Sequence, residues 1–297
     1  GINDTSLERS TVVVANGSRV TTERLKSANG LVHRSGETDV SADGRIVIER
    51  VDFDGDSVWD RTTSEIYELT ADGTSIVSIE RESANGTLLA SETSIVSADR
   101  KSQEIRTHLD GDGLVDRVTL ISTADNGETF RETSYFSVDG SLMASNSYRS
   151  SGDGRMTEEM YDHDGDGYAD ITRSWSEVVT EGGHVIQAEV FRGTSNILLA
   201  SRNIATDDTA LSTTTSLDVD GDGVFELVSE EVIYTAADGD IHFGGETRDE
   251  NGVLQSRLIS TTSGNELSSR VEVDFDGDGR KDLVNSVPDA LRQRRTS

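Results

Sequence analysis

Residues 162–170 read DHDGDGYAD, and four close variants of this acidic nonapeptide recur along the chain. They read DFDGDSVWD at 52–60, HLDGDGLVD at 108–116, DVDGDGVFE at 218–226 and DFDGDGRKD at 274–282. Their first positions are separated by 56, 54, 56 and 56 residues. Self-similarity at a fixed period of this order is typical of solenoids, propellers and other repeat arrays, so we predict a repeat protein.

Three further turn signals recur at the same period between the acidic nonapeptides. In the second repeat they are Asp72-Gly73, Asn85-Gly86 and Asp99-Arg100. Asn-Gly and Asp-Gly pairs between β-favouring runs indicate hairpins, because both residues tolerate the positive φ of a type I′ turn. Four turns per period predict an all-β chain with four antiparallel strands per repeat, for example over residues 61–70, 74–83, 87–97 and 101–107.

One interval is two residues shorter than the others. Twelve residues separate Asp60 from Asp72, whereas ten separate Asp116 from Asn126. A β-strand tolerates the loss of two residues, because every remaining side chain keeps its face of the sheet. This deletion favours strands over disorder, although low hydrophobicity combined with high charge is also typical of disordered chains.

The repeats predict a single domain over residues 4–287. Residues 1–4 look like the end of a further acidic loop, so we expect that the chain was cut from a longer repetitive parent. Residues 288–297 are basic, and we expect a tail outside the repeats. The predicted repeats are 4–59, 60–115, 116–169, 170–225 and 226–281, followed by a partial strand at 282–287.

Strand direction alternates at every turn, so the five acidic loops are predicted to lie at the same end of the strands. The whole number of repeats favours a five-bladed β-propeller, in which each acidic loop carries the chain from one blade to the next. The alternative is an open β-solenoid or superhelical array, in which each repeat buries a face against its neighbours.

Composition excludes several classes of partner. The 297 residues include 56 acidic and 27 basic side chains, which gives a net charge of −29. Such a chain repels phosphates, so we expect neither nucleic acid nor an anionic membrane as a partner. No apolar run approaches the roughly 18 to 20 residues that span a bilayer, so we expect no membrane insertion.

The chain must also be stabilised by something besides a large core. Only 33% of its residues are apolar, and cysteine is absent. Disulfides are therefore excluded, and bound cations are the candidate that would also neutralise charge.

The acidic nonapeptides are predicted to bind calcium. Carboxylates stand at positions 1, 3, 5 and 9, and position 7 offers its backbone carbonyl. Ca²⁺ takes about six to eight oxygen ligands from carboxylates, carbonyls and water, whereas Mg²⁺ is stricter in geometry and zinc prefers His or Cys. The predicted ligands are Asp52, Asp54, Asp56, Val58, Asp60, Asp110, Asp112, Leu114, Asp116, Asp162, Asp164, Asp166, Tyr168, Asp170, Asp218, Asp220, Asp222, Val224, Glu226, Asp274, Asp276, Asp278, Arg280 and Asp282.

We expect one Ca²⁺ per loop, five in all, with unequal affinities. The second loop should be the weakest, because His108 replaces its first carboxylate. The first loop should be strained, because Ser57 stands where the others have the glycine of the sharp bend. The alternative to metal binding is that Asp and Gly are simply good turn formers on a solvated face.

The loops carry a family resemblance. Their DxDxDGxxD pattern resembles the calcium loops of integrin-type FG-GAP propellers and of thrombospondin type 3 repeats. The series ADG, NGxLxxS and DxDGDGxxD resembles tandem arrays of large secreted bacterial RTX-like and adhesin-like proteins over residues 4–287. The RTX nonapeptide GGxGxDxUx and the FG-GAP phrases themselves are absent. The resemblance implies extracellular calcium binding and leaves the architecture open.

Catalytic chemistry is not indicated. The five histidines make no HExxH or paired-ligand spacing, and no GxSxG elbow, P-loop or dinucleotide fingerprint occurs. We therefore expect no catalytic residues, no organic cofactor and no enzymatic activity.

The expected function is that of a calcium-stabilised spacer or adhesion module in a secreted or cell-surface bacterial protein. It would be a monomeric fragment of a longer repeat protein, with a surface glycan or a protein receptor as its partner. The alternative is a carbohydrate-binding accessory domain of a polysaccharide-active protein. There aromatic residues would stack on sugar rings, the candidates being Trp59, Trp175, Tyr67, Tyr161 and Tyr168.

Overall fold

The computed structural model describes residues 5–287, and nearly all of its regular structure is β-strand. The predicted tail at 288–297 and the predicted loop remnant at 1–4 lie outside the described residues. No helix in the described range is long and apolar enough to cross a membrane.

Within residues 5–287, twenty-one strands follow one another, interrupted by a single 3₁₀ turn at Thr194–Asn196. The strands up to the third acidic loop are β1 (Thr5–Val13), β2 (Arg19–Ser27), β3 (Val32–Val40), β4 (Ile46–Asp52), β5 (Arg61–Leu69), β6 (Ser75–Ser83), β7 (Leu88–Val96), β8 (Ser102–His108), β9 (Arg117–Thr123), β10 (Thr129–Phe136), β11 (Leu142–Ser150) and β12 (Met156–Asp162). Those after it are β13 (Ile171–Val179), β14 (Val185–Gly193), β15 (Leu198–Thr206), β16 (Ser212–Asp218), β17 (Leu227–Thr235), β18 (Ile241–Asp249), β19 (Leu254–Thr262), β20 (Ser269–Asp274) and β21 (Leu283–Val287).

The turn spacing therefore predicted the strands closely. The four strands expected in the second repeat correspond to β5, β6, β7 and β8, with ends within one residue of the prediction. The two missing residues also fall where expected, because β9 has seven residues and its counterpart β5 has nine. The all-β prediction is confirmed.

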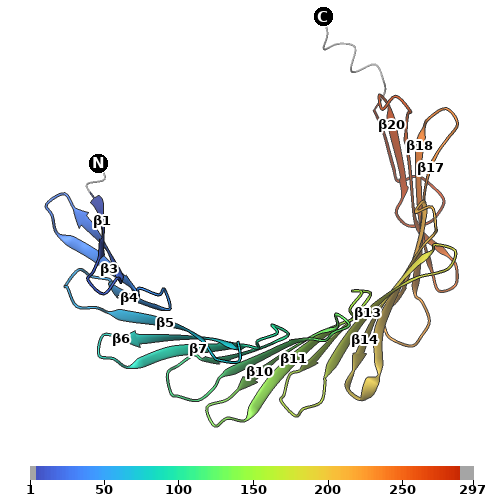
Figure 1. Cartoon of the computed structure of the whole chain (residues 1–297). Helices are drawn as coiled ribbons and strands as arrows, with labels where there is room; N and C mark the ends of the chain where they lie inside the picture. Colours follow the sequence, from blue (N-terminus) through green and yellow to red (C-terminus); the bar gives the residue numbers. More distant parts are fainter. Residues whose placement is uncertain (1–4, 288–297) are drawn as a thin grey trace, which may run out of the picture. The chain divides into compact units, whose positions relative to one another are not determined.

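The chain divides into two compact units. The first comprises the described residues up to Arg149 together with 162–168, and the second comprises 150–161 together with 169–287. In the first unit, each strand pairs antiparallel with the next along the chain, from β1–β2 to β9–β10. In the second, the same meander runs from β12 to β21, and Figure 1 shows the strands of each unit following one another in chain order.

The prediction of a five-bladed propeller is wrong. In a propeller the acidic loop would leave one blade and enter the next, so the strands on its two sides would not pair. Here β4 pairs with β5 from Ile46↔Ile66 to Val51↔Arg61 across the first acidic loop. In the second unit β16 pairs with β17 across the fourth loop in the same way. The sheet of each unit is thus continuous through the loops, and the open-array alternative fits.

The sheets have almost no apolar core. Within residues 5–287, Val273 is the one apolar residue that is buried, with 9% of its surface exposed. The other buried side chains are polar, and one example is the threonine pair Thr119 and Thr133, whose hydroxyl oxygens lie 3.1 Å apart. Cross-strand pairs of this kind each contribute about 0.2–1 kcal/mol. Stability is therefore spread over many weak contacts between neighbouring strands.

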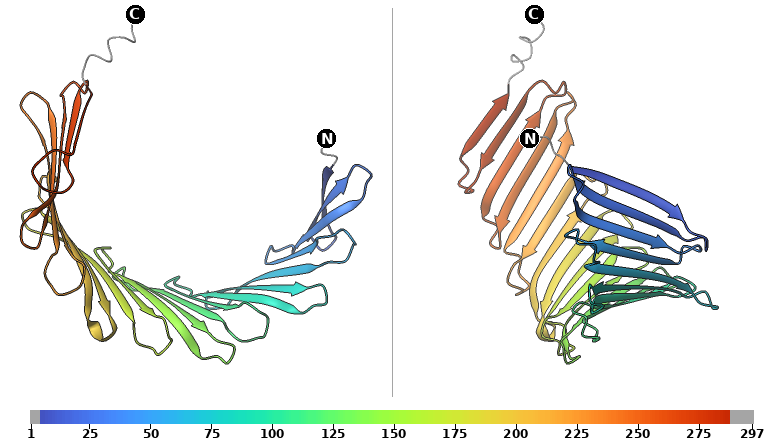
Figure 2. Two further views of the ribbon diagram at one scale, coloured as in Figure 1. Left: turned by 180° about the vertical axis from the view of Figure 1, so that it is seen from behind. Right: turned by 90° about the vertical axis from the view of Figure 1, so that its left-hand side faces the viewer.

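Because strand direction alternates, two kinds of connection lie at opposite ends of the strands in each unit's sheet. In the first unit, the acidic loops at 53–60 and 109–116 lie at the same end of the strands as the turns at 28–31 and 84–87. The turns at Asn16-Gly17, Asp43-Gly44, Asp72-Gly73 and Asp99-Arg100 lie at the opposite end of the strands. The right-hand view of Figure 2 shows the N-terminal strands side by side with their turns gathered at the two edges. Within each unit, the prediction that acidic loops share one end of the strands is confirmed.

Candidate metal centres

The fourth acidic loop joins β16 to β17, and its first carboxylate belongs to the strand. Asp218 is the last residue of β16 and only 1% of its surface is exposed. Its Oδ1 accepts the N–H of Gly221 at 2.6 Å and its Oδ2 accepts the N–H of Gly223 at 3.1 Å. This buried carboxylate thereby holds the loop curled over the end of the strand.

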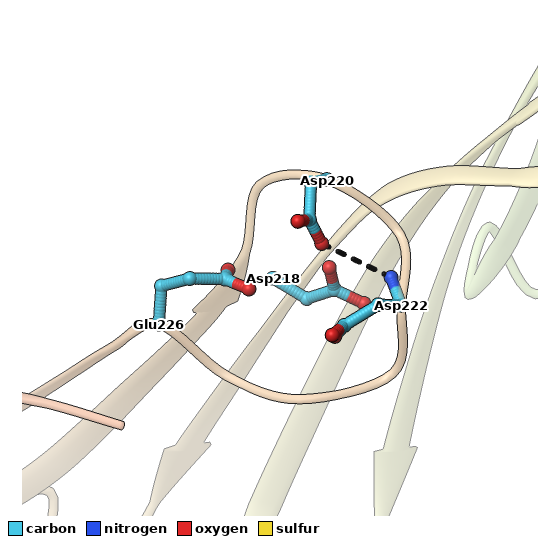
Figure 3. A group of neighbouring side chains, drawn as sticks. All are labelled: Asp218, Asp220, Asp222 and Glu226. Atoms are coloured by element: carbon cyan, nitrogen blue, oxygen red, sulfur yellow. Dashed lines mark hydrogen bonds between the residues drawn. The ribbon is translucent and has the colours of Figure 1, made fainter. Parts of the chain in front are cut away.

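Three more carboxylates point into the same loop, as Figure 3 shows. Asp220 Oδ1 accepts the N–H of Asp222 at 3.2 Å, and Glu226 Oε2 accepts the N–H of Val219 at 2.7 Å. Asp222 Oδ1 likewise accepts the N–H of Val224 at 2.7 Å. These backbone contacts fix the carboxylates so that Asp218, Asp220, Asp222 and Glu226 each offer one oxygen, all within 4.8 Å of one another.

This spacing fits a calcium ion. Ca²⁺–oxygen distances are about 2.3–2.6 Å, so oxygens on opposite sides of one ion are about 5 Å apart. Oxygens that all lie within 4.8 Å of one another are therefore close enough to bind one such ion. Without a cation, the four negative charges would repel one another across this short distance.

Three other loops bring carboxylates together in the same manner, with one difference. In them the residues at positions 1, 3 and 9 form the group and the carboxylate at position 5 is not part of it. That carboxylate accepts the N–H of the residue two positions later, as Asp222 does in the fourth loop. The groups are Asp52, Asp54 and Asp60; Asp162, Asp164 and Asp170; and Asp274, Asp276 and Asp282. The carboxylates outside them are Asp56, Asp166 and Asp278.

The first carboxylate is buried in each of these loops too. Asp52, Asp162 and Asp274 have 1%, 5% and 6% of their surface exposed. Burial acts to raise the pKa of Asp52, but hydrogen bonds from the N–H groups of Gly55 and Ser57 and from the Ser35 hydroxyl outweigh it, so its pKa falls below the usual value. The group stays ionised at neutral pH, as a metal ligand requires.

The second loop does not form such a group among the described residues. Asp110, Asp112 and Asp116 are present, but His108 occupies the first position and its Nδ1 lies 2.6 Å from the carbonyl oxygen of Leu114. This carbonyl is the predicted metal ligand at position 7. For Val58, Tyr168, Val224 and Arg280 the corresponding carbonyls remain predictions.

The glycine at position 4 was missed by sequence reasoning, although it occurs in all five loops. A Cβ on Gly221 would lie 2.2 Å from the carbonyl oxygen of Leu198, at the start of β15. The equivalent distances are 2.1 Å from Gly55 to Val32, 1.9 Å from Gly111 to Leu88, 2.3 Å from Gly165 to Leu142 and 2.0 Å from Gly277 to Leu254. Each acidic loop therefore packs directly against the backbone at the first residue of a neighbouring strand, and only glycine permits this approach.

The glycine at position 6 has a different role. Gly113, Gly167, Gly223 and Gly279 adopt φ of 83–88°, and a Cβ on any of them would meet nothing within 4 Å. Position 6 thus needs only the left-handed conformation. Ser57 adopts it as well, with φ of 72°, which is the strained bend expected at this position.

The chain matches no family model, and no curated protein is significantly similar to it. The resemblance to calcium-binding repeats therefore rests on the acidic loops and their spacing.

Proposed function

We propose that the chain is a calcium-stabilised repeat segment of a secreted or cell-surface bacterial protein, where it acts as a spacer or an adhesion module. The observation that carries the proposal is the grouping of carboxylate oxygens within 4.8 Å in four loops of one repeated design. A turn-forming role alone would not require three or four carboxylates to converge.

The donor chemistry favours Ca²⁺ over other ions. All the grouped donors are carboxylate oxygens, which hard cations prefer, and no histidine or cysteine joins any group. The loops also differ in which carboxylates converge, and Ca²⁺ tolerates such variation better than Mg²⁺ with its strict octahedral geometry.

The near absence of an apolar core explains why such a segment would need ions. A cation that binds only the folded loop stabilises the folded state by mass action, and millimolar extracellular calcium would keep the sites filled. The chain would then be weakly folded where calcium is scarce and would fold after export. A folded, charged and single-layered segment suits a spacer between other parts of a surface protein.

Ion counting by native mass spectrometry tests the metal-binding part of this proposal. We expect several Ca²⁺ ions on the wild-type chain, and one fewer on the double variant Asp220→Asn/Asp222→Asn. The control is Asp238→Asn/Asp240→Asn, which removes the same charge from an ordinary turn in the next repeat and should leave the count unchanged. Equal counts for all three proteins, or equal occupancy by Mg²⁺ at the same concentration, would contradict the proposal.

A glycan array in calcium buffer separates the spacer role from the carbohydrate-binding alternative. A spacer should bind no glycan. Calcium-dependent binding of one glycan class would favour the alternative, and the exposed Tyr168 on the third acidic loop would then be the first aromatic residue to substitute.

A further inference from the structure

The second acidic loop, residues 109–116 between β8 and β9, keeps the frame of the others although its first carboxylate is replaced. Leu109 N–H donates to Asp116 Oδ2 at 2.5 Å, and Leu114 N–H donates to Asp112 Oδ1 at 2.7 Å. Gly111 is seated on the Leu88 carbonyl like its counterparts. The loop therefore reaches the same fold without the carboxylate that curls the others.

His108 supplies the missing closure by a different bond. Its Nδ1 lies 2.6 Å from the Leu114 carbonyl oxygen, and since a carbonyl can only accept, the imidazole N–H must donate. This bond joins position 1 to position 7 directly across the loop. A bound cation would link the same two positions through a carboxylate and this carbonyl.

The carbonyl is thereby engaged, and the loop has one carboxylate fewer than the others. Position 1 contributes a ring nitrogen in place of an oxygen, and Asp110, Asp112 and Asp116 are absent from the carboxylate groups of the described chain. Hard cations select oxygen donors, so this loop offers a poorer site with fewer ligands.

We infer that His108 takes the place of the cation in the second loop, so that this loop is closed without metal and binds none. The inference rests on the proposed function, because it divides the five loops into four that depend on calcium and one that does not. Residues around β8 and β9 should consequently stay ordered when calcium is removed, and the hairpins β4–β5, β12–β13, β16–β17 and β20–β21 should loosen.

Reciprocal substitutions test the inference by native mass spectrometry at saturating calcium. The wild-type chain should bind four ions. His108→Asp restores the first carboxylate and should bind five, and Asp218→His copies the second loop into the fourth and should bind three. Four ions on both the wild-type chain and His108→Asp, or five on the wild-type chain, would overturn the inference while leaving calcium binding intact. No ion on the wild-type chain would overturn both proposals.

Hydrogen exchange gives a second readout that does not depend on how well the variants fold. On the wild-type chain, excess chelator should speed exchange in residues 46–66, 156–176, 212–232 and 269–287 and leave residues 102–122 close to their rate in calcium. If the second loop loses its protection together with the others, His108 does not replace the cation.

Discussion

Because the acidic loops pack closely against the start of a neighbouring strand, the effect of Gly221→Ala can be predicted quantitatively. Gly221 has φ of 77°, and its new Cβ would lie 2.2 Å from the Leu198 carbonyl oxygen, 2.6 Å from its carbon and 2.9 Å from the Leu199 nitrogen. These are backbone atoms, so no side-chain rotation relieves the overlap. Ordinary contact begins at 3.4 Å, and the loop or the turn would have to move by about 1 Å.

Gly223→Ala is the matched control in the same loop. Gly223 has φ of 88° and a Cβ there meets nothing within 4 Å, so this variant carries only the left-handed strain, about 1–2 kcal/mol. Gly221→Ala carries a similar strain together with the overlap, and overpacking of this kind costs about 1–3 kcal/mol more. The difference corresponds to about 5- to 150-fold in the equilibrium between closed and open loop.

Hydrogen exchange of residues 212–232, measured in excess chelator, reports this opening directly. Exchange at the ends of β16 and β17 next to the loop should be faster in Gly221→Ala than in Gly223→Ala by the factor above, and calcium affinity should fall in the same order. Equal exchange in the two variants would show that the loop does not pack against the backbone of Leu198, and would refute the proposed role of the position-4 glycine.

Two further predictions concern the turn residues. Ser57→Gly removes a left-handed serine and should stabilise the β4–β5 hairpin by about 1 kcal/mol in chelator, which slowed exchange at residues 46–66 would reveal and unchanged exchange would contradict. The hydroxyls of Ser137 and Ser141 and the Ser141 N–H lower the pKa of Asp139 from 3.8 to about 2, and hydrogen bonds lower the pKa of Asp43, Asp72, Asp99 and Asp153 in the same direction. A folded-state pKa below the unfolded one contributes stability that is present above pH ~4 and lost as the pH falls through ~2, so the melting temperature in chelator should drop across that window. Asp139→Asn should show a smaller drop than the wild-type chain, and a drop of the same size would contradict this role of Asp139.

The strands could be predicted from the sequence because their limits are set locally. Asn-Gly and Asp-Gly pairs such as Asp72-Gly73 dictate a turn through their own backbone preferences, so β5 ends shortly before this pair and β6 begins shortly after it. The neighbours of each strand could not be predicted in this way. The period of the acidic loops is equally compatible with blades and with one continuous sheet, and the β4–β5 pairing that decides between them involves no local signal.

In the acidic loops, too, the local features could be predicted from the sequence and the non-local contacts could not. The alternating Asp residues of the fourth loop predicted convergence, because a tight turn brings alternate side chains to one point, and the structure groups all four there. The role of Gly221 depends on Leu198, which is far away in sequence, and the closure of the second loop depends on a bond between His108 and a backbone carbonyl. Neither contact follows from composition or spacing, although the recurrence of glycine at position 4 in all five loops was a visible sign.

The central claim is that calcium supplies stability that an apolar core does not. A thermal melt followed by far-ultraviolet circular dichroism, in millimolar calcium and again in excess chelator, tests it most directly. We expect a large upward shift of the melting temperature in calcium, with a smaller shift in magnesium. The same melting temperature and the same spectrum in calcium and in chelator would contradict it, and the acidic loops would then be turns alone.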